Sequence, residues 1–158
     1  MRLVTSNDFN DVYEIYMDKN NNPYLLHEIS DQETFKPIFD GLLKRDQFYA
    51  YEIDNEVACI CACDYGIART SHVASLGTLA FKSKYHGKEY AQKFIQSIVN
   101  NLQEQGFKRI DLWVEADNPK AQKFYKKLGF KEEARIKNYY KRANYDDYVD
   151  EIVMAKLF

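Results

Sequence analysis

Residues 114–130 read VEADNPKAQKFYKKLGF, and this stretch carries the clearest structural signals of the chain. The side chain of Asn118 can accept a hydrogen bond from a free amide at a helix start, and Pro119 has no amide hydrogen to lose at the first helical position. Glycine is the residue type that most often follows a helix end. We therefore expect a helix that begins after Asn118 and ends at Leu128-Gly129.

Two side chains in this stretch should share one edge of the helix. Tyr125 follows Asn118 by seven residues, which is two helical turns. Upstream, apolar residues alternate from Ile110 to Val114 and predict a strand, with Glu115 at its end. A helix start beside an open strand end is a common ligand site in mixed folds, so we expect a ligand here.

The N-terminal third predicts two amphipathic helices after a short apolar start at Leu3 and Val4. Asp8 is placed to cap the first helix, which carries Phe9 to Tyr16 and ends before the NNNP run. Ser30, with Glu33 three residues later, has the form of a capping box for the second helix, which continues to Leu43.

The rest of the chain predicts a sheet with one further helix. Phe48–Ile53 and Val57–Asp64 form a hairpin around Asp54-Asn55, and three antiparallel strands are the simplest account when His72–Phe81 is added. A helix runs from about Lys88 to Gln105. The last hairpin pairs Phe130–Lys141 with Tyr148–Leu157. The element order is β, α, α, β, β, β, α, β, α, β, β, which indicates a mixed α+β sheet covered by helices.

Composition limits the class of protein. The chain has 158 residues, 46% of them hydrophobic and 29% charged, with a net charge of −2, which indicates one folded domain over residues 1–158. The slightly acidic balance argues against bulk nucleic-acid binding, and no apolar stretch has the length of a membrane span or a secretion signal. Cys59, Cys61 and Cys63 alternate on one strand face and should be reduced, buried small residues, which favours a cytoplasmic location.

The segment Tyr85-His86-Gly87-Lys88-Glu89-Tyr90-Ala91 is a loop that opens a helix. Amides at a helix start have no partners within the helix and can converge on phosphate oxygens. Lys84 and Lys88 add positive charge. Taken alone, a Gly-Lys pair before a helix is more often an ordinary turn.

The two segments together resemble the GNAT superfamily of acetyl-CoA-dependent N-acetyltransferases. The later motif of that superfamily, N-x-x-A-x-x-x-Y-x-x-x-G-F, is matched at Asn118, Ala121, Tyr125, Gly129 and Phe130. The element order agrees along nearly the whole chain. The stretch from Arg69 to Ala74 and Tyr148 to Asp150 look most like bacterial L-amino-acid N-acetyltransferases.

The earlier motif of the superfamily, R/Q-x-x-G-x-G/A, is matched poorly. His86 stands where the family has Arg or Gln, Glu89 where it has Gly, and only Ala91 agrees. An inward-pointing Glu89 would repel a bound pyrophosphate by a few kcal/mol at an effective dielectric of about 20, and an outward-pointing one would be screened. The chain is thus an enzyme with a modified loop or a domain with weakened cofactor binding.

The resemblance implies a GNAT fold and direct transfer of acetyl from acetyl-CoA, with no metal, to a primary amine. The α-amine of an amino acid or a similar small molecule is the first choice, with a protein N-terminus or a polyamine as alternatives, and a homodimer stays open. Tyr125 matches the general acid at the sulfur. The residues implied for cofactor binding are Leu79, Ala80, Phe81, His86, Gly87, Lys88, Glu89, Tyr90, Ala91, Asn118 and Tyr125.

For the general base and the acceptor site, several residues are available. Glu115 is the first choice for the base, His72 is the second, and an amine of low pKa needs neither. Acidic residues would hold a cationic acceptor, and Arg69 or Arg142 would hold an acceptor carboxylate. The residues available near the acceptor are Tyr24, Glu28, Tyr139, Tyr140, Tyr145, Asp146 and Asp147.

Overall fold

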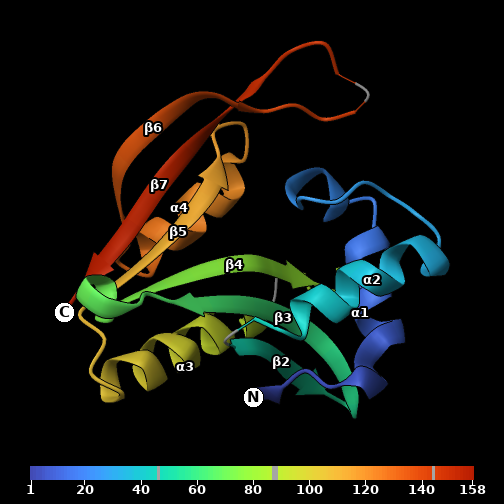
Figure 1. Ribbon diagram of the computed structural model, residues 1–158, viewed down its shortest axis with the longest axis horizontal. Helices are drawn as coiled ribbons and strands as arrows, with labels where there is room; N and C mark the ends of the chain where they lie inside the picture. The colour runs from blue at the N-terminus through green and yellow to red at the C-terminus, as the bar shows by residue number, and fades with distance from the viewer. Residues whose placement is uncertain (46, 87–88, 144) are drawn as a thin grey trace. The chain divides into compact units, whose positions relative to one another are not determined.

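A computed structural model describes the chain except for residues 46, 87, 88 and 144. The described residues form a mixed, mostly antiparallel sheet of seven strands in the order β1-β2-β3-β4-β5-β7-β6, in which β4 and β5 are parallel. The predicted α+β class and element order are therefore confirmed (Figure 1). The elements are β1 (Arg2–Leu3), α1 (Phe9–Met17), α2 (Gln32–Leu42), β2 (Gln47–Ile53), β3 (Glu56–Tyr65), β4 (Val73–Phe81), α3 (Tyr90–Glu104), β5 (Arg109–Glu115), α4 (Pro119–Lys127), β6 (Lys131–Tyr140) and β7 (Val149–Leu157).

The chain divides into two compact units. The N-terminal unit comprises Met1–Asp64 and Gly77–Ile98, and the C-terminal unit comprises Tyr65–Leu76 and Val99–Phe158. Both β4 and α3 contribute residues to each unit. A single domain over residues 1–158 stays a prediction.

Aromatic packing between two helices forms the core of the N-terminal unit. The rings of Tyr16 on α1 and Phe35 on α2 lie 5.0 Å apart, and those of Phe9 and Phe39 lie 5.3 Å apart. Tyr16, Phe35 and Phe39 are almost fully buried, as the helical spacing predicts. The cluster continues onto the sheet through Phe48, Ile60 and Ala80.

The caps of these two helices differ from the prediction. Asp31, not Ser30, is the N-cap of α2, and its carboxylate accepts a hydrogen bond from the Thr34 amide at 2.8 Å. A carboxylate is favoured there because the helix N-terminus carries partial positive charge. Asp8 does occupy the N-cap position of α1, but its carboxylate accepts instead from the Thr5 amide at 2.7 Å and from Arg2.

A buried ammonium group fixes the end of β4 within the N-terminal unit. Lys82 is 5% exposed, and its Nζ lies 2.6 Å from Asp11, 2.8 Å from Glu14 and 3.3 Å from Glu56. Burial alone would lower the pKa of Lys82, but hydrogen bonds and charge from these carboxylates raise it above its usual value. Glu56 also contacts Lys84 and the Tyr85 hydroxyl, and these hydrogen bonds lower its pKa to about 2.

The predicted burial of the cysteines is confirmed. Cys59, Cys61 and Cys63 on β3 are not in disulfides and have no exposed surface. Burial raises the pKa of Cys59 and Cys61, so both are protonated and inert at neutral pH.

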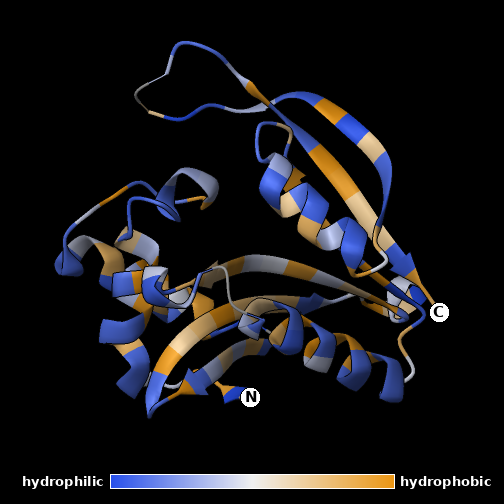
Figure 2. Cartoon of the chain, turned by 180° about the vertical axis from the view of Figure 1, so that it is seen from behind, coloured by the Kyte–Doolittle hydropathy of each residue, from blue (hydrophilic) through white to orange (hydrophobic). Residues whose placement is uncertain are grey.

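The last hairpin lies beside β5 within the C-terminal unit (Figure 1). β7 is antiparallel to β5, with Leu112 opposite Met154 and Val114 opposite Ile152. These four side chains are buried on one face of the ladder. Figure 2 shows a hydrophobic centre in β7, whereas the described part of the loop that joins β6 to β7 is mostly hydrophilic. No helix in the described part of the chain combines the length and the apolarity needed to span a membrane.

Replacement of Lys82 by Met should lower the free energy of unfolding by about 1–3 kcal/mol. The change leaves three carboxylates without their shared partner, two of them mostly buried. Urea unfolding measures the difference. Lys44→Met, at an exposed lysine of the same unit, is the control and should change stability by less than about 0.5 kcal/mol. Equal stability of the two variants would contradict the anchoring role of Lys82.

Candidate active site

The start of α4 is capped as the sequence predicts. The Asn118 side-chain oxygen accepts a hydrogen bond from the Ala121 amide at 3.1 Å, and Pro119 occupies the first turn. The Asn118 amide donates to the Glu115 carbonyl at 3.0 Å. The cap thus ties the first turn of α4 to the end of β5.

The end of α4 holds the backbone of Tyr125. Gly129 has a φ of +88°, which a side-chain-bearing residue adopts only with strain. This conformation lets the Phe130 amide donate to the Tyr125 carbonyl at 3.1 Å, and the Gly129 amide to the Lys126 carbonyl at 3.1 Å. These are the two hydrogen bonds of a Schellman motif. The motif residues Asn118, Gly129 and Phe130 therefore each contribute to the start or the end of α4.

Ring packing fixes the Tyr125 side chain as well. The ring centroid of Tyr125 lies 5.9 Å from that of Phe130 and 5.4 Å from that of Phe124, both in edge-on geometry. Tyr125 is 9% exposed. A tyrosine held at both backbone and ring presents its hydroxyl in one place, which a proton donor requires.

Glu115 lies half-buried at the end of β5, next to the Asn118 cap. Burial raises the pKa of Glu115 to about 7; the positive charge of Arg142 acts in the opposite direction, and the negative charge of Asp117 adds to the increase. A carboxylate with this pKa can both accept and release a proton near neutral pH.

Arg142 and Tyr140 border the same carboxylate. Arg142 forms a two-pronged ion pair with Asp117 at 2.7 and 3.2 Å, and its guanidinium lies 5.2 Å from the centre of the Tyr140 ring. Burial and the charge of Glu115 raise the pKa of Tyr140, which is therefore neutral near pH 7. The C-terminal unit thus gathers Glu115, Asp117 and Arg142 at one end of β5.

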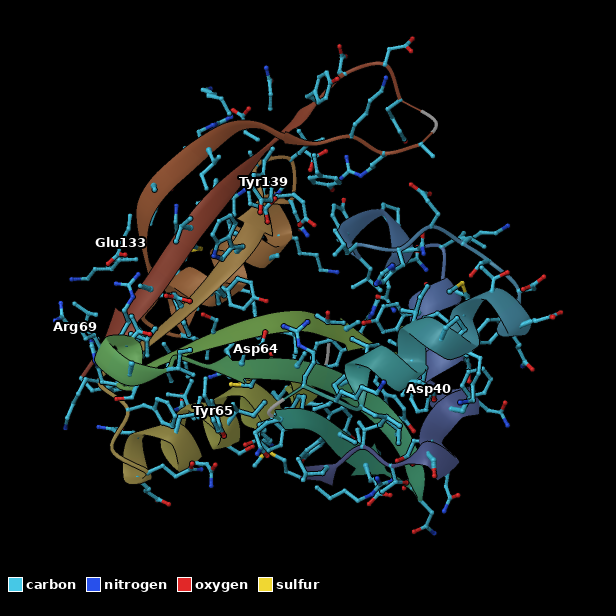
Figure 3. The ribbon with its side chains drawn as sticks, in the orientation of Figure 1. Asp40, Asp64, Tyr65, Arg69, Glu133 and Tyr139 are labelled. Atoms are coloured by element: carbon cyan, nitrogen blue, oxygen red, sulfur yellow. The ribbon has the colours of Figure 1, made fainter. Side chains whose placement is uncertain are left out.

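Two predicted candidates lie elsewhere in the C-terminal unit. The His72 carbonyl accepts hydrogen bonds from the Lys108 and Arg109 amides, so His72 lies at the start of β5 and Glu115 at its end. Six residues of strand separate these positions by about 20 Å. Arg69 lies in the turn Ala68–Thr70 before β4, and Figure 3 shows it well away from Tyr139. Neither His72 nor Arg69 therefore joins Glu115.

The second group of predicted residues belongs to the N-terminal unit. On β4, Ala80 is buried and Leu79 and Phe81 are half-buried. Thr78, just before them, has a φ of +49°, an unusual backbone conformation for a β-branched residue and one that interrupts the regular strand.

The Phe81 carbonyl accepts two side-chain hydrogen bonds. Asn21 Nδ2 donates to it at 2.7 Å, and His86 Nε2 lies 3.2 Å away. The His86 ring thus lies against the end of β4. The buried Asn21 was missed by the sequence analysis, because the NNNP run reads only as a helix breaker.

The Glu89 side chain points away from the interior. It is 82% exposed and its carboxylate lies 3.4 Å from Lys93 Nζ, one helical turn on. Tyr90, which is half-buried, packs edge-on against Tyr85 with ring centroids 5.9 Å apart. Ala91 follows in the first turn of α3. The predicted residues Gly87 and Lys88 lie outside the described part of the chain.

The mixed sheet, a β4 strand with an irregular backbone at Thr78, and a capped α4 beside an acidic strand end agree with the fold that the resemblance implies. A model of the acetyltransferase (GNAT) family matches residues 9–130. A [ribosomal protein bS18]-alanine N-acetyltransferase of Haemophilus ducreyi is 31% identical over 122 residues, which cover 73% of this chain and 80% of that protein. The chain therefore belongs to the GNAT family and is an N-acetyltransferase.

Two further comparisons agree with this assignment. An uncharacterised N-acetyltransferase of Methanocaldococcus jannaschii is 25% identical over 144 residues, and the alignment spans 88% of this chain but only 63% of that protein. The crystal structure of spermidine N-acetyltransferase from Vibrio cholerae, solved with CoA and spermine, has a TM-score of 0.82 at 17% identity, with 99% of this chain and 93% of that chain covered. This structural likeness concerns the fold.

Replacement of Gly129 by Ala should lower the free energy of unfolding by about 1 kcal/mol. A Cβ at this position meets only the flexible Lys156 side chain at 3.6 Å, so the cost comes from the positive φ. Thermal or urea unfolding provides the measurement. Gly41→Ala is the matched control of opposite sign, because Gly41 lies inside α2 with open space around it and should gain about 0.5–1 kcal/mol.

Proposed function

We propose that this N-acetyltransferase acts on an α-amine, with Glu115 as the general base and Tyr125 as the general acid. Acetyl-CoA supplies the acetyl group as a thioester. Glu115 takes a proton from the acceptor ammonium, and the freed amine attacks the carbonyl carbon. The carbon–sulfur bond then breaks as Tyr125 gives its proton to the departing sulfur, and the second proton lost by the nitrogen returns Tyr125 to its neutral form. The observation that carries this proposal is a half-buried carboxylate with a pKa of about 7 beside the capped start of α4.

The pKa of the base favours an α-amine over a side-chain amine. An α-ammonium at a chain end has a pKa of about 8, close to that of Glu115, so transfer of its proton to Glu115 is only slightly uphill. A lysine-like ammonium has a pKa of about 10.4, which makes the same step much more unfavourable. Glu115 is thus matched to the first kind of acceptor.

A free amino acid and a polypeptide N-terminus both carry an α-amine. The Haemophilus ducreyi relative, which by its name acts on an alanine of ribosomal protein bS18, favours the polypeptide. A panel of free amino acids, alanine-initiated peptides and polyamines, assayed by release of the CoA thiol, tests the choice. We expect turnover with peptides or amino acids; turnover with polyamines alone would overturn the proposal.

Each unit contains residues proposed to bind acetyl-CoA. Within the N-terminal unit, Leu79, Ala80 and Phe81 are proposed to contact the pantetheine arm; within the C-terminal unit, Asn118 and Tyr125 are proposed to contact the thioester. The loop and first turn from His86 to Ala91 would receive the pyrophosphate at the start of α3, where helix amides favour anions.

The outward position of Glu89 supports cofactor binding. Its exposed carboxylate is screened by water and paired with Lys93, so its repulsion of a pyrophosphate is small. The alternative, a GNAT-like module with weakened cofactor binding, requires this carboxylate to point inward. Calorimetric titration with acetyl-CoA distinguishes the two, because the enzyme proposal requires saturable binding that Glu89→Gly barely changes.

Tyr125→Phe should lower kcat by about 100-fold or more and leave the Kd for acetyl-CoA nearly unchanged. The variant keeps the ring packing against Phe130 and loses only the proton donor. Steady-state kinetics and calorimetry measure the two quantities. The exposed Tyr148→Phe serves as the control and should keep full activity. An unchanged kcat in Tyr125→Phe would remove Tyr125 from the mechanism.

Glu115→Gln should lower kcat/KM by about 100-fold at pH 7. In the wild type, the carboxylate is the active form, so kcat/KM should rise as pH increases through about 7. The variant should lose this step and regain rate only at higher pH, where the amine becomes neutral by itself. The exposed Glu104→Gln is the charge-matched control. A wild-type profile that stays flat between pH 6 and pH 8, roughly one unit on either side of the pKa, would contradict Glu115 as the base.

A further inference from the structure

Glu151 is a buried carboxylate that the proposed mechanism does not use. It lies on β7 and is 8% exposed. Within the part of the chain that the structure describes, its side chain has neither a hydrogen bond nor an ion pair. Buried carboxylates are costly to keep without partners, so its retention needs a reason.

The sheet register places Glu151 directly opposite Glu115. The two residues are paired in the antiparallel ladder of β5 and β7, so both side chains leave the same face. Directly opposite residues have Cβ atoms about 5 Å apart. Carboxylates on two residues with neighbouring Cβ atoms repel each other when both are ionised, and one proton held by the pair relieves the repulsion.

The neighbouring groups on that face do not neutralise the pair. Asp117 adds a further negative charge, and Arg142 is the cation that acts on both carboxylates, although it is engaged by Asp117 at 2.7 Å. Tyr140 on β6 stays neutral near pH 7. On the opposite face of β7, Asp150 is taken up by Arg135 and Lys137, both at 2.8 Å.

We propose that Glu115 and Glu151 form a carboxyl pair that shares one proton, with Glu151 as the positioning residue that sets the pH range in which Glu115 accepts a proton. The charge of Glu151 makes Glu115 a stronger base than a lone strand-end carboxylate would be. Burial, together with the charge of Glu115, raises the pKa of Glu151 to about 7, which agrees with a shared proton. This inference rests on the proposed role of Glu115 and adds the residue that tunes it.

Glu151→Gln tests the pair through the pH dependence of catalysis. Loss of the neighbouring charge should move the acid limb of kcat/KM to lower pH by about one unit. Glu132→Gln, the same change at a β6 residue outside the pair, should leave the midpoint where it is. A midpoint that stays unchanged in Glu151→Gln, with only kcat reduced, would show a purely structural role and overturn the proposal.

A titration of the protein without substrates tests the shared proton independently of activity. With glutamate labelled by carbon-13 at the carboxyl group, NMR should show two coupled titrations that disappear in either Glu115→Gln or Glu151→Gln. In each variant the remaining carboxyl should titrate at lower pH than in the wild type. If each carboxyl titrates identically with and without its neighbour, the pair does not exist, even if Glu115 proves to be the base. If the pair titrates as expected and no amine is acetylated, the failure lies with the proposed function.

Stability supplies a third measurement, with its sign given by the raised pKa. The folded state favours protonated Glu151. This preference stabilises the fold fully below the unfolded pKa of about 4.5, and the stabilisation is lost as pH rises through about 7. Glu151→Gln should therefore have a higher Tm than the wild type at pH 8, with no such gain at pH 4.5. A lower Tm for the variant at pH 8 would mean that the ionised carboxylate holds the fold together, contrary to the proposal.

Discussion

Two caps on a short helix are the constraint on which the candidate site depends. α4 has nine residues, too few to be stable as an isolated helix in water. The Asn118 side chain satisfies its first turn and the turn at Gly129 satisfies its last. Both caps also hydrogen-bond to the backbone of a proposed catalytic residue: the Asn118 amide to Glu115 and the Phe130 amide to Tyr125. The contacts that stabilise the helix therefore also position the proposed base and acid.

In contrast to these caps, the acidic residues where β5 ends and β7 begins cost stability. Glu115 and Glu151 are buried or half-buried next to each other, with Arg142 shared among several carboxylates. A pair of apolar residues would pack there at lower cost. Buried Lys82 in the N-terminal unit is different, since three carboxylates surround it and the cluster joins α1 to the end of β4. The first group is suited to proton transfer and the second to stability.

The sequence predicts the regular elements well because their signals are local. The period of the apolar residues, the Asn118-Pro119 start and Gly129 each act within a few positions, and the structure confirms them. The cap of α2 was predicted one residue early, because Ser30 and Asp31 are both good caps and only the backbone decides between them. Tyr125 and Glu115 could be selected from the motif and the strand end. Glu151 could not, since its partner lies 36 positions away and only the register of β5 and β7 brings them together.

The single tryptophan of the chain lies on the same strand face as this carboxyl pair. Trp113 precedes Glu115 by two residues, is 45% exposed and packs against Tyr139 on β6 with ring centroids 5.1 Å apart. Indole emission responds to nearby charge and to water. The chain therefore carries an intrinsic fluorophore at the strand end where an acceptor would be bound, and its emission can report occupancy and protonation there without a label.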